Sequence, residues 1–447
     1  MIHPILRKLI LIAVLLTGSH AFAHDFEVDG IYYNILSSTD KTVEVTYRGS
    51  HHAEYTDEYT GSIVIPESII HNDTVYSVTA ISDYAFYYSF SLTSLTIGNS
   101  VTTIGDWAFS ECRNLNSLTI LDSVTTIGGD AFSGCINLTS LTIPNSVTSI
   151  GDSAFMNCFC LTSLIIGNSV TSIGNKAFYG CNNLTKVTIP NSVTSIGSLA
   201  FAGCRSLTVV TIPNSVTTIG DHAFEYCSSL TSVIIPNSVT SIDFGTFKSC
   251  SSLTSVTIPN SVTSIGHSAF YGCSSLTSVT IPDNVTAINS RTFAYCSSLA
   301  SLTIGNSVTN IGEYAFYDCY ALTSLTSLNP IPPICGNNVF YGVHTQHIPL
   351  YVPQESVPQY QTTDTWMNFQ NIIGKDFSGV EETLGHNEVN VSIENGNIVI
   401  GGTKNAPIEV YSTSGQCVYS GTATSIPVST KGLYVVKVNG KSFKVTL

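Results

Sequence analysis

The chain has 447 residues, only 10% of them charged, and a formal net charge of -14 at neutral pH. A surface with this excess of carboxylates repels phosphate, which argues against nucleic acids and anionic membranes as partners. A typical domain of about 150 residues would suggest three domains, but one internal repeat occupies most of the chain and overrides that count.

The first 23 residues have the pattern of a signal peptide. Arg7 and Lys8 precede an apolar run over residues 9–16, and the small-residue site Ala21-Phe22-Ala23 follows. The run is shorter than the roughly 20 residues that a membrane-spanning helix needs, and no later stretch comes close. We therefore expect an exported protein without membrane insertion, located at the cell surface or outside the cell in association with the outer membrane, in preference to the periplasm.

Residues 24–62 are expected to form an N-terminal β cap. Alternating apolar residues in the segments 28–33 and 43–47 predict a β hairpin. A cap is needed here because the first unit of a repeat array exposes an apolar face.

A 23-residue repeat occupies residues 63–328. Each unit has a Phe, a Cys three residues later from the second unit onward, and a Leu six residues after the Phe. The phenylalanines are Phe86, Phe109, Phe132, Phe155, Phe178, Phe201, Phe224, Phe247, Phe270, Phe293 and Phe316.

One unit illustrates the coil that we expect. Leu141 and Ile143 alternate with polar residues, which predicts a short strand, and the Pro-Asn-Ser segment 144–146 predicts a turn. Ile150 returns to the core, and we interpret Gly151 as a residue that relaxes the backbone. One coil cannot bury its apolar residues alone, so the coils should stack into a solenoid of short parallel strands.

The pattern Leu-x-x-Leu-x-Ile, continued by Pro-Asn-Ser-Val-x-x-Ile-Gly and Ala-Phe-x-x-Cys, resembles the BspA-type leucine-rich repeat of bacterial surface proteins over about residues 63–355. The resemblance implies a leucine-rich-repeat solenoid and a surface binding protein of a Bacteroidetes-type bacterium. Departures are local: Asp243 and Asn289 replace Gly, and Thr246 and Thr292 replace the Ala before Phe. We expect these residues to soften their coils without breaking the register.

Three further segments follow the repeat. Residues 329–376 are expected to form a C-terminal cap plugged by Trp366, and residues 377–388 a linker. Short apolar segments in residues 389–447 predict a small β-sandwich. The segments 408–411, 414–416 and 431–438 resemble the C-terminal sorting domain of the type IX secretion pathway, which implies an export address. The expected fold class is therefore mainly β, a capped solenoid followed by a β-sandwich.

The cysteines do not predict a disulfide framework, although an exported chain with thirteen Cys invites one. Ten of them share one inward coil position, where we expect free thiols packed as small apolar groups. Parallel stacked side chains are poorly oriented for the disulfide dihedral of about 90°. No Cys-x-x-Cys pair exists and His does not share the position, so we expect no metal site.

Catalytic patterns are absent from the sequence. It has no nucleophile elbow, phosphate loop, zinc-protease or calcium-loop motif, so we expect no catalytic residue, no cofactor and no enzyme. Asp106, Asp152 and Asp221 recur at one coil position, where they are expected to solvate the turn. An enzyme would need a cleft that this uniform array does not predict.

The outward face of the strands is the candidate binding surface. Ser and Thr form two ladders along it, which are consistent with an ordinary soluble β surface. Ile165, Lys186, Val209 and Ile234 interrupt these ladders in the middle of the array, where a partner could dock. The candidate ligand-binding residues are Ser140, Thr142, Ser163, Ile165, Lys186, Thr188, Val209, Thr211, Ser232 and Ile234.

These patterns favour a monomeric, non-catalytic adhesin that recognises host proteins, glycans or other cells through the solenoid. The alternative is a structural or periplasmic scaffold without a host ligand. Protease treatment of intact cells would distinguish the two.

Overall fold

The structure, a computed structural model, describes residues 24–377, 390–394, 397–401, 407–412, 417–428, 433–438 and 441–446. The expected signal peptide and nearly all of the expected linker lie outside the described residues. The chain divides into two compact units, one ending at Asp376 and the other beginning at Phe377. None of the described helices is both apolar enough and long enough to cross a bilayer.

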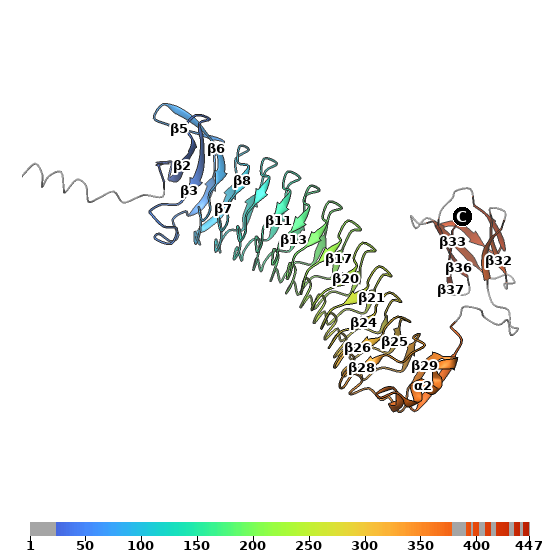
Figure 1. Cartoon of the computed structure of the whole chain (residues 1–447). Coiled ribbons are helices and arrows are strands. Elements are labelled where there is room, and N and C mark those ends of the chain that lie inside the picture. Colours follow the sequence, from blue (N-terminus) through green and yellow to red (C-terminus); the bar gives the residue numbers. More distant parts are fainter. Residues whose placement is uncertain are drawn as a thin grey trace, which may run out of the picture. The chain divides into compact units, whose positions relative to one another are not determined.

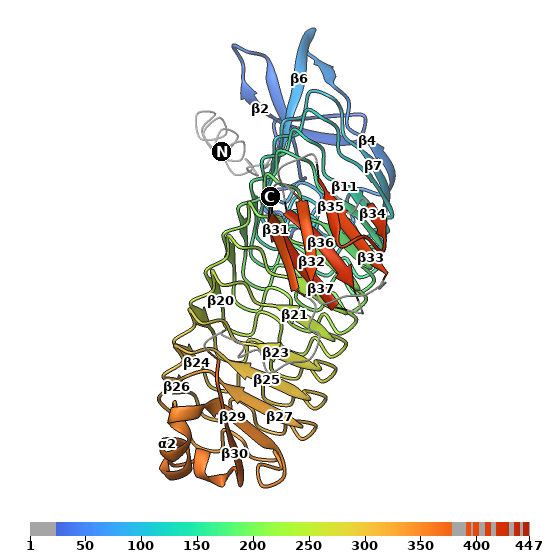
Figure 2. The same ribbon diagram turned by 90° about the vertical axis from the view of Figure 1, so that its right-hand side faces the viewer.

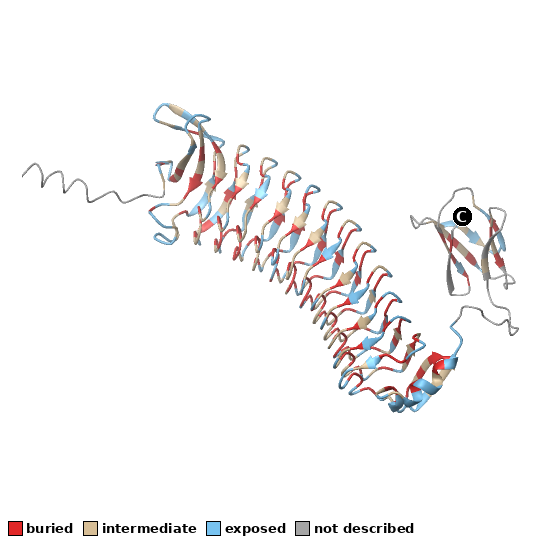
Figure 3. Cartoon of the chain, viewed as in Figure 1, coloured by how far each residue is buried: buried red, intermediate tan, exposed pale blue. Residues whose placement is uncertain are grey.

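The first unit is a solenoid of about 13 coils with 23-residue spacing, as the repeat predicts. The coils stack along one gently curved axis (Figure 1). Figure 3 shows buried and exposed residues alternating along every coil. The phenylalanine rings form a continuous column in this core, with neighbouring ring centroids 4.7 to 5.7 Å apart.

The first ladder of parallel strands contains the predicted Leu-x-Ile strands. Partners are 23 residues apart, as in Leu141 opposite Leu164. The ladder continues through two strands beyond residue 328. Its strands are β4 (Gly61–Val64), β7 (Leu92–Thr96), β9 (Ser117–Thr119), β11 (Ser140–Thr142), β13 (Ser163–Ile165), β15 (Lys186–Thr188), β17 (Val209–Thr211), β19 (Ser232–Ile234), β21 (Ser255–Thr257), β23 (Ser278–Thr280), β25 (Ser301–Ile304), β27 (Ser324–Ser327), β29 (Pro349–Pro353) and β30 (Asn371–Lys375). They pair in four groups, which are β4 to β9, β11 with β13, β15 to β21, and β23 to β30.

A second parallel ladder, which the sequence analysis did not predict, runs through the residues that end in the core isoleucine of each coil. Figure 2 shows β20, β24 and β26 on the other side of the coils from β21, β23 and β25. Its strands are β3 (Thr42–Thr46), β6 (Thr74–Ile81), β8 (Thr103–Ile104), β10 (Thr126–Ile127), β12 (Ser149–Ile150), β14 (Ser172–Ile173), β16 (Ser195–Ile196), β18 (Thr218–Ile219), β20 (Ser241–Ile242), β22 (Ser264–Ile265), β24 (Ala287–Ile288), β26 (Asn310–Ile311) and β28 (Ile334–Cys335).

The turn that carries Phe and Cys forms a third row of backbone hydrogen bonds between coils. The Phe132 N–H donates to the Ala154 carbonyl at 2.7 Å, and the same bond recurs along the array. Two residues of this turn adopt positive φ, for example Ser153 (55°) and Asn157 (60°). Backbone hydrogen bonds between coils thus occur on three sides of the solenoid.

The interpretation that Gly151 relaxes the backbone is wrong. Gly151 does not have positive φ, and a Cβ placed on it would lie 2.5 Å from the carbonyl carbon of Gly128 in the preceding coil. Glycine at this position lets the backbones of neighbouring coils approach closely, although Asp243 and Asn289 occupy it in two other coils.

The N-terminal end of the solenoid is closed by β strands. β1 (Phe26–Val28) and β2 (Ile31–Ser37) pair antiparallel, β2 pairs with β3, and β3 joins β6 in parallel. β5 (Ser68–His71) and β6 form a hairpin that accounts for the inserted residues of the first coil. The buried Tyr59 ring lies 4.3 Å from Phe86 and closes the end of the phenylalanine column.

The C-terminal end is closed by η1 (Gln354–Ser356), α2 (Val357–Thr362) and η2 (Trp366–Asn368). Trp366 is fully buried, and its indole N–H donates to the Pro333 carbonyl at 2.8 Å. The buried Ser327 stands where earlier coils have Ile, and its hydroxyl lies 2.7 Å from the Tyr360 hydroxyl. The departure at Ser327 therefore provides a polar partner for the cap.

The second unit is a small antiparallel β-sandwich. One sheet has the order β31 (Asn390–Glu394), β32 (Asn397–Gly401) and β35 (Ser425–Pro427). The other has the order β34 (Cys417–Gly421), β33 (Ile408–Ser412), β36 (Leu433–Val438) and β37 (Lys441–Thr446). Ile398 and Ile426 of the first sheet share a core with Val410 and Val436 of the second.

Candidate functional site

The structure places all ten predicted binding residues on the exposed side of β11, β13, β15, β17 and β19. Period-2 alternation explains this placement, because the residue between each exposed pair is buried in the core. Ile165, Val209 and Ile234 are 59%, 43% and 73% exposed. A large part of the apolar surface of these side chains is therefore available to a partner.

We call the exposed side of the first ladder the strand face. A shallow hollow of about 550 Å³ lies beside part of it. Thr142, Asn145, Ile165 and Asn168 are among the residues that line it. The structure therefore brings Thr142 and Ile165 together at one concavity, whereas Ser232 and Ile234 lie three coils further along the array.

A second surface, which sequence reasoning missed, is formed by the turn between the second ladder and the cysteine. We call it the turn face and define it as the six coil positions from three residues before each Phe to two residues after it. The strand face repeats Ser and Thr, whereas the position two residues before Phe holds Trp107, Lys176, His222, Arg291 and Tyr314 in different coils. This variation between coils was the signal that could have identified the surface.

The turn face is hollowed over the coils of Phe224 to Phe316. The groove has a volume of about 720 Å³ and is lined mainly by aromatic rings and by two cations. Its principal lining residues are Tyr226, Lys248, Tyr271, Arg291, Tyr295 and Tyr317. We call this feature the tyrosine groove.

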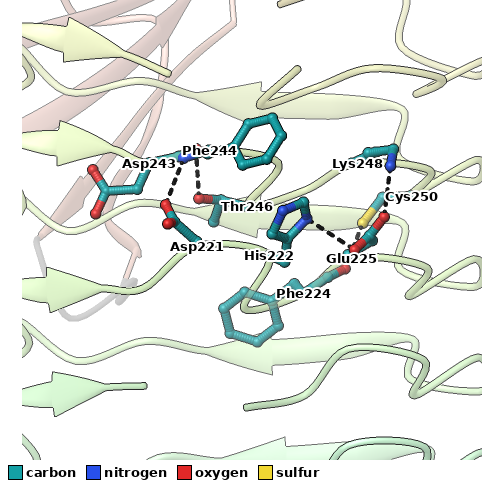
Figure 4. Close-up of polar contacts among 9 residues, drawn as sticks. All are labelled: Asp221, His222, Phe224, Glu225, Asp243, Phe244, Thr246, Lys248 and Cys250. Carbon is teal, nitrogen blue, oxygen red and sulfur yellow. Dashed lines mark hydrogen bonds and ion pairs between the residues drawn. The ribbon is translucent and has the colours of Figure 1, made fainter. Parts of the chain in front are cut away.

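Figure 4 shows the polar contacts at the start of the tyrosine groove. Glu225 is only 8% exposed, and its carboxylate lies 2.8 Å from His222 Nδ1 and 2.9 Å from Lys248 Nζ. The Glu225 carboxylate is the first cause that raises the pKa of Lys248, so this lysine stays charged at neutral pH. The ion pair holds the ammonium group at the groove, where it also lies 5.9 Å from the Tyr226 ring centroid.

The recurring aspartates tie coils together, in addition to the expected solvation of the turn. Asp106 Oδ1 accepts a hydrogen bond from the Gly129 N–H at 2.6 Å, and Asp152 Oδ1 accepts one from the Asn175 N–H at 2.7 Å. Asp221 binds the Phe244 N–H in the same way at 3.0 Å (Figure 4). Each carboxylate accepts a backbone N–H of the following coil.

The ten repeated cysteines are buried and unpaired. Each thiol donates to the carbonyl of the Phe 26 residues earlier, as Cys135 does to Phe109 at 3.3 Å. Burial raises the pKa of Cys204 and Cys273 to about 12. Burial disfavours the thiolate, which is the form that acts as nucleophile and metal ligand. Among the described residues there is no group of three or more potential metal ligands.

Comparisons with known proteins agree with this architecture. The chain is similar to a leucine-rich repeat protein from Bacteroides ovatus, with 28% identity and a TM-score of 0.56 over 79% of this chain and all of that one. It is also similar to a leucine rich cell surface protein from Faecalibacterium prausnitzii, with 31% identity and a TM-score of 0.44 over 68% of this chain and 94% of that one. No curated protein sequence matches the chain.

The sequence family described as BspA type leucine rich repeat region matches in six copies over residues 79–182, 148–273 and 241–360. These segments cover more than half of the chain and coincide with the stacked coils. The chain therefore belongs to the BspA-type leucine-rich repeat family.

Proposed function

We propose that this protein is an exported, cell-surface adhesin that binds host proteins, glycans or other cells through its solenoid. BspA-type proteins are non-catalytic repeat proteins of the cell surface, which supports this class of function. The observation that carries the proposal is the exposure of Ile165, Val209 and Ile234 on a strand face that presents mainly hydroxyl groups from β9 to β25. A rigid face of this kind offers a binding partner apolar contacts without an ordering cost on the solenoid's side.

Binding through the strand face can be tested with charged substitutions. The double variant Ile165→Lys and Ile234→Lys should lose capture of extracellular host proteins, because each lysine places a charge in the proposed contact. Thr119→Lys and Thr257→Lys provide the matched control, since both threonines are exposed in the same ladder. Equal capture by the two double variants would contradict binding at this face.

The location can be tested on intact cells. We expect a broad-specificity protease added outside to digest the protein, whose mature N-terminus should be His24 if residues 1–23 are a signal peptide. Complete protection until the outer membrane is opened would instead support the periplasmic scaffold.

We also propose that residues 389–447 form a type IX sorting domain. The segments 408–411 and 433–438, which resemble that domain, lie on the paired strands β33 and β36, while Ser414 to Gln416 lie outside the described residues. Deletion of residues 377–447 should leave the solenoid folded but retain it in the periplasm. Normal surface display of this shortened chain would overturn the assignment.

A further inference from the structure

The tyrosine groove presents an aromatic or cationic side chain from each of five successive coils. In chain order these include Tyr226, Lys248, Tyr271, Tyr295 and Tyr317, and Tyr341 follows in the next coil. The ring centroids are 5.1 Å apart between Tyr271 and Tyr295, and 5.4 Å between Tyr295 and Tyr317. Tyr317 and Tyr341 continue the row at 5.0 Å. The groove therefore offers a regular series of contacts along the solenoid axis.

The charge of the groove favours an anionic occupant. Lys248 and Arg291 are the two cations that line it. Lys248 is ion-paired with Glu225, whereas Arg291 has no ion pair among the described residues and supplies the excess positive charge. The Arg291 guanidinium lies 5.4 Å from the Tyr314 ring centroid, so the ring supports this cation at the surface. The net charge of the whole chain is -14, so Arg291 is a local positive charge on a mainly acidic protein.

The spacing of the groove distinguishes between types of extended chain. A peptide strand places side chains of one face about 6.7 Å apart, so it would lose register with the coils within a few residues. An extended pyranose chain with equatorial 1,4 linkages advances by close to one coil spacing per sugar. Tyrosine suits such a ligand because its ring packs against the apolar face of a sugar while its hydroxyl forms hydrogen bonds.

We propose that the tyrosine groove binds an acidic, extended glycan whose sugars step along successive coils and whose anionic groups meet Arg291. This proposal rests on the proposed function as a binding protein and adds the ligand class and the site. The volume of about 720 Å³ is large enough for a short stretch of such a chain.

The ligand class can be tested by calorimetric titration of the full chain with a β-1,4-linked oligomannuronate. A cello-oligosaccharide of equal length keeps the linkage but lacks the charge, and poly-glutamate keeps the charge but lacks the sugar rings. We expect the oligomannuronate to bind at least about tenfold more tightly than either, as one charge-assisted contact provides. Equal binding of the cello-oligosaccharide or of poly-glutamate would overturn the proposal.

Variants locate the site. Arg291→Asn should weaken oligomannuronate binding by about tenfold, and Asn tolerates the positive φ of 57° at this position. Lys176→Asn is the matched control, because Lys176 occupies the same coil position with a φ of 55° outside the groove. Tyr271→Ala should weaken binding similarly, with Tyr179→Ala as its control.

If the Arg291→Asn and Tyr271→Ala variants bound oligomannuronate as tightly as the unaltered chain, the assignment of the site to the tyrosine groove would be wrong. If the same preparations still captured host proteins through Ile165 and Ile234, the proposed adhesin function would stand while the glycan proposal failed. If a chain bound oligomannuronate but captured no host protein, the glycan proposal would stand while binding of host proteins through the strand face failed.

Discussion

At the scale of single residues, the repeated cysteine has a specific structural partner. Its thiol fills a small apolar space and donates to a phenylalanine carbonyl of the preceding coil, as Cys250 does to Phe224 at 3.2 Å. The sequence predicted the inward position correctly because ten cysteines share one register. It could not predict the hydrogen bond, since the acceptor belongs to another coil.

These thiols predict a loss of stability in alkali. Burial raises the pKa of Cys204, Cys273 and Cys319 from 9.0 to about 12. As the pH rises, the unfolded chain releases these protons before the folded chain does. The stabilising contribution of each buried thiol is therefore fully present below pH 9 and is lost as the pH rises toward 12. Within this pH range, each thiol should lower the free energy of unfolding by about 1.4 kcal/mol per pH unit.

Thermal unfolding measured across that window checks this prediction. The Cys204→Ala and Cys273→Ala double variant should show a shallower dependence on pH than the unaltered chain. Cys417→Ser should not, because Cys417 is exposed. The same dependence in all three proteins would contradict the role of the buried thiols.

The glycine that follows each core isoleucine predicts a contrast between two neighbouring positions. Gly151→Ala should destabilise the solenoid by about 1 to 3 kcal/mol, because its Cβ would overlap the backbone of the preceding coil. Gly129→Ala should be tolerated, since its Cβ would meet nothing closer than 3.4 Å. Urea unfolding measures the free energy of unfolding of both variants. Equal values would contradict the prediction, because they would show that neighbouring coils can move apart at Gly151 without a loss of stability.

At the scale of elements, the departures at Asp243 and Asn289 are paired substitutions. Where Gly becomes Asp243 or Asn289, the Ala three residues later becomes Thr246 or Thr292, and that threonine donates to the new residue's carbonyl at 3.0 or 2.6 Å. The Asn289 side chain also donates to the Ile265 carbonyl at 2.8 Å. Within the described coils the second ladder is interrupted between β18 and β20, next to Asp243, but it continues through β24 beside Asn289.

This interruption predicts a local difference in hydrogen exchange. Backbone amides of Ser241 and Ile242 should exchange faster than those of Ser195 and Ile196, which are paired on both sides. The double variant Asp243→Gly and Thr246→Ala restores the usual residues and should slow exchange at β20. Exchange can be measured by mass spectrometry. An unchanged exchange rate at β20 in the double variant would contradict this explanation.

The predictable parts of the fold were those with a local period. Leu141 and Ile143 identify a strand because they alternate with polar residues, whereas the two residues of β12 are too few to alternate. Positive φ in the turn occurs at Lys176 and Leu199, which carry no turn signal of their own. The tyrosine groove escaped prediction because its rings come from different coil positions, so they do not recur at a constant spacing in the sequence.

At the scale of the whole molecule, each coil contacts mainly its neighbours, so the number of coils is adjustable. Deletion of residues 132–154 removes one period and joins Ala131 to Phe155, which restores the repeat. We expect this chain to fold cooperatively with slightly lower stability, because one interface between coils is lost. Deletion of residues 132–142 should prevent folding, since it breaks the register. Circular dichroism and thermal melting of both chains test this, and equal folding would contradict the stacked arrangement.

The two closed ends have a consequence for assembly in solution. A stack of this kind carries unpaired amides and an apolar cross-section at each terminus, and either one could recruit another molecule end to end. The strands β1 and β2 with Tyr59 cover one terminus, and α2 with Trp366 covers the other. The two caps therefore prevent solenoids from joining end to end into fibres, and each solenoid keeps a defined length.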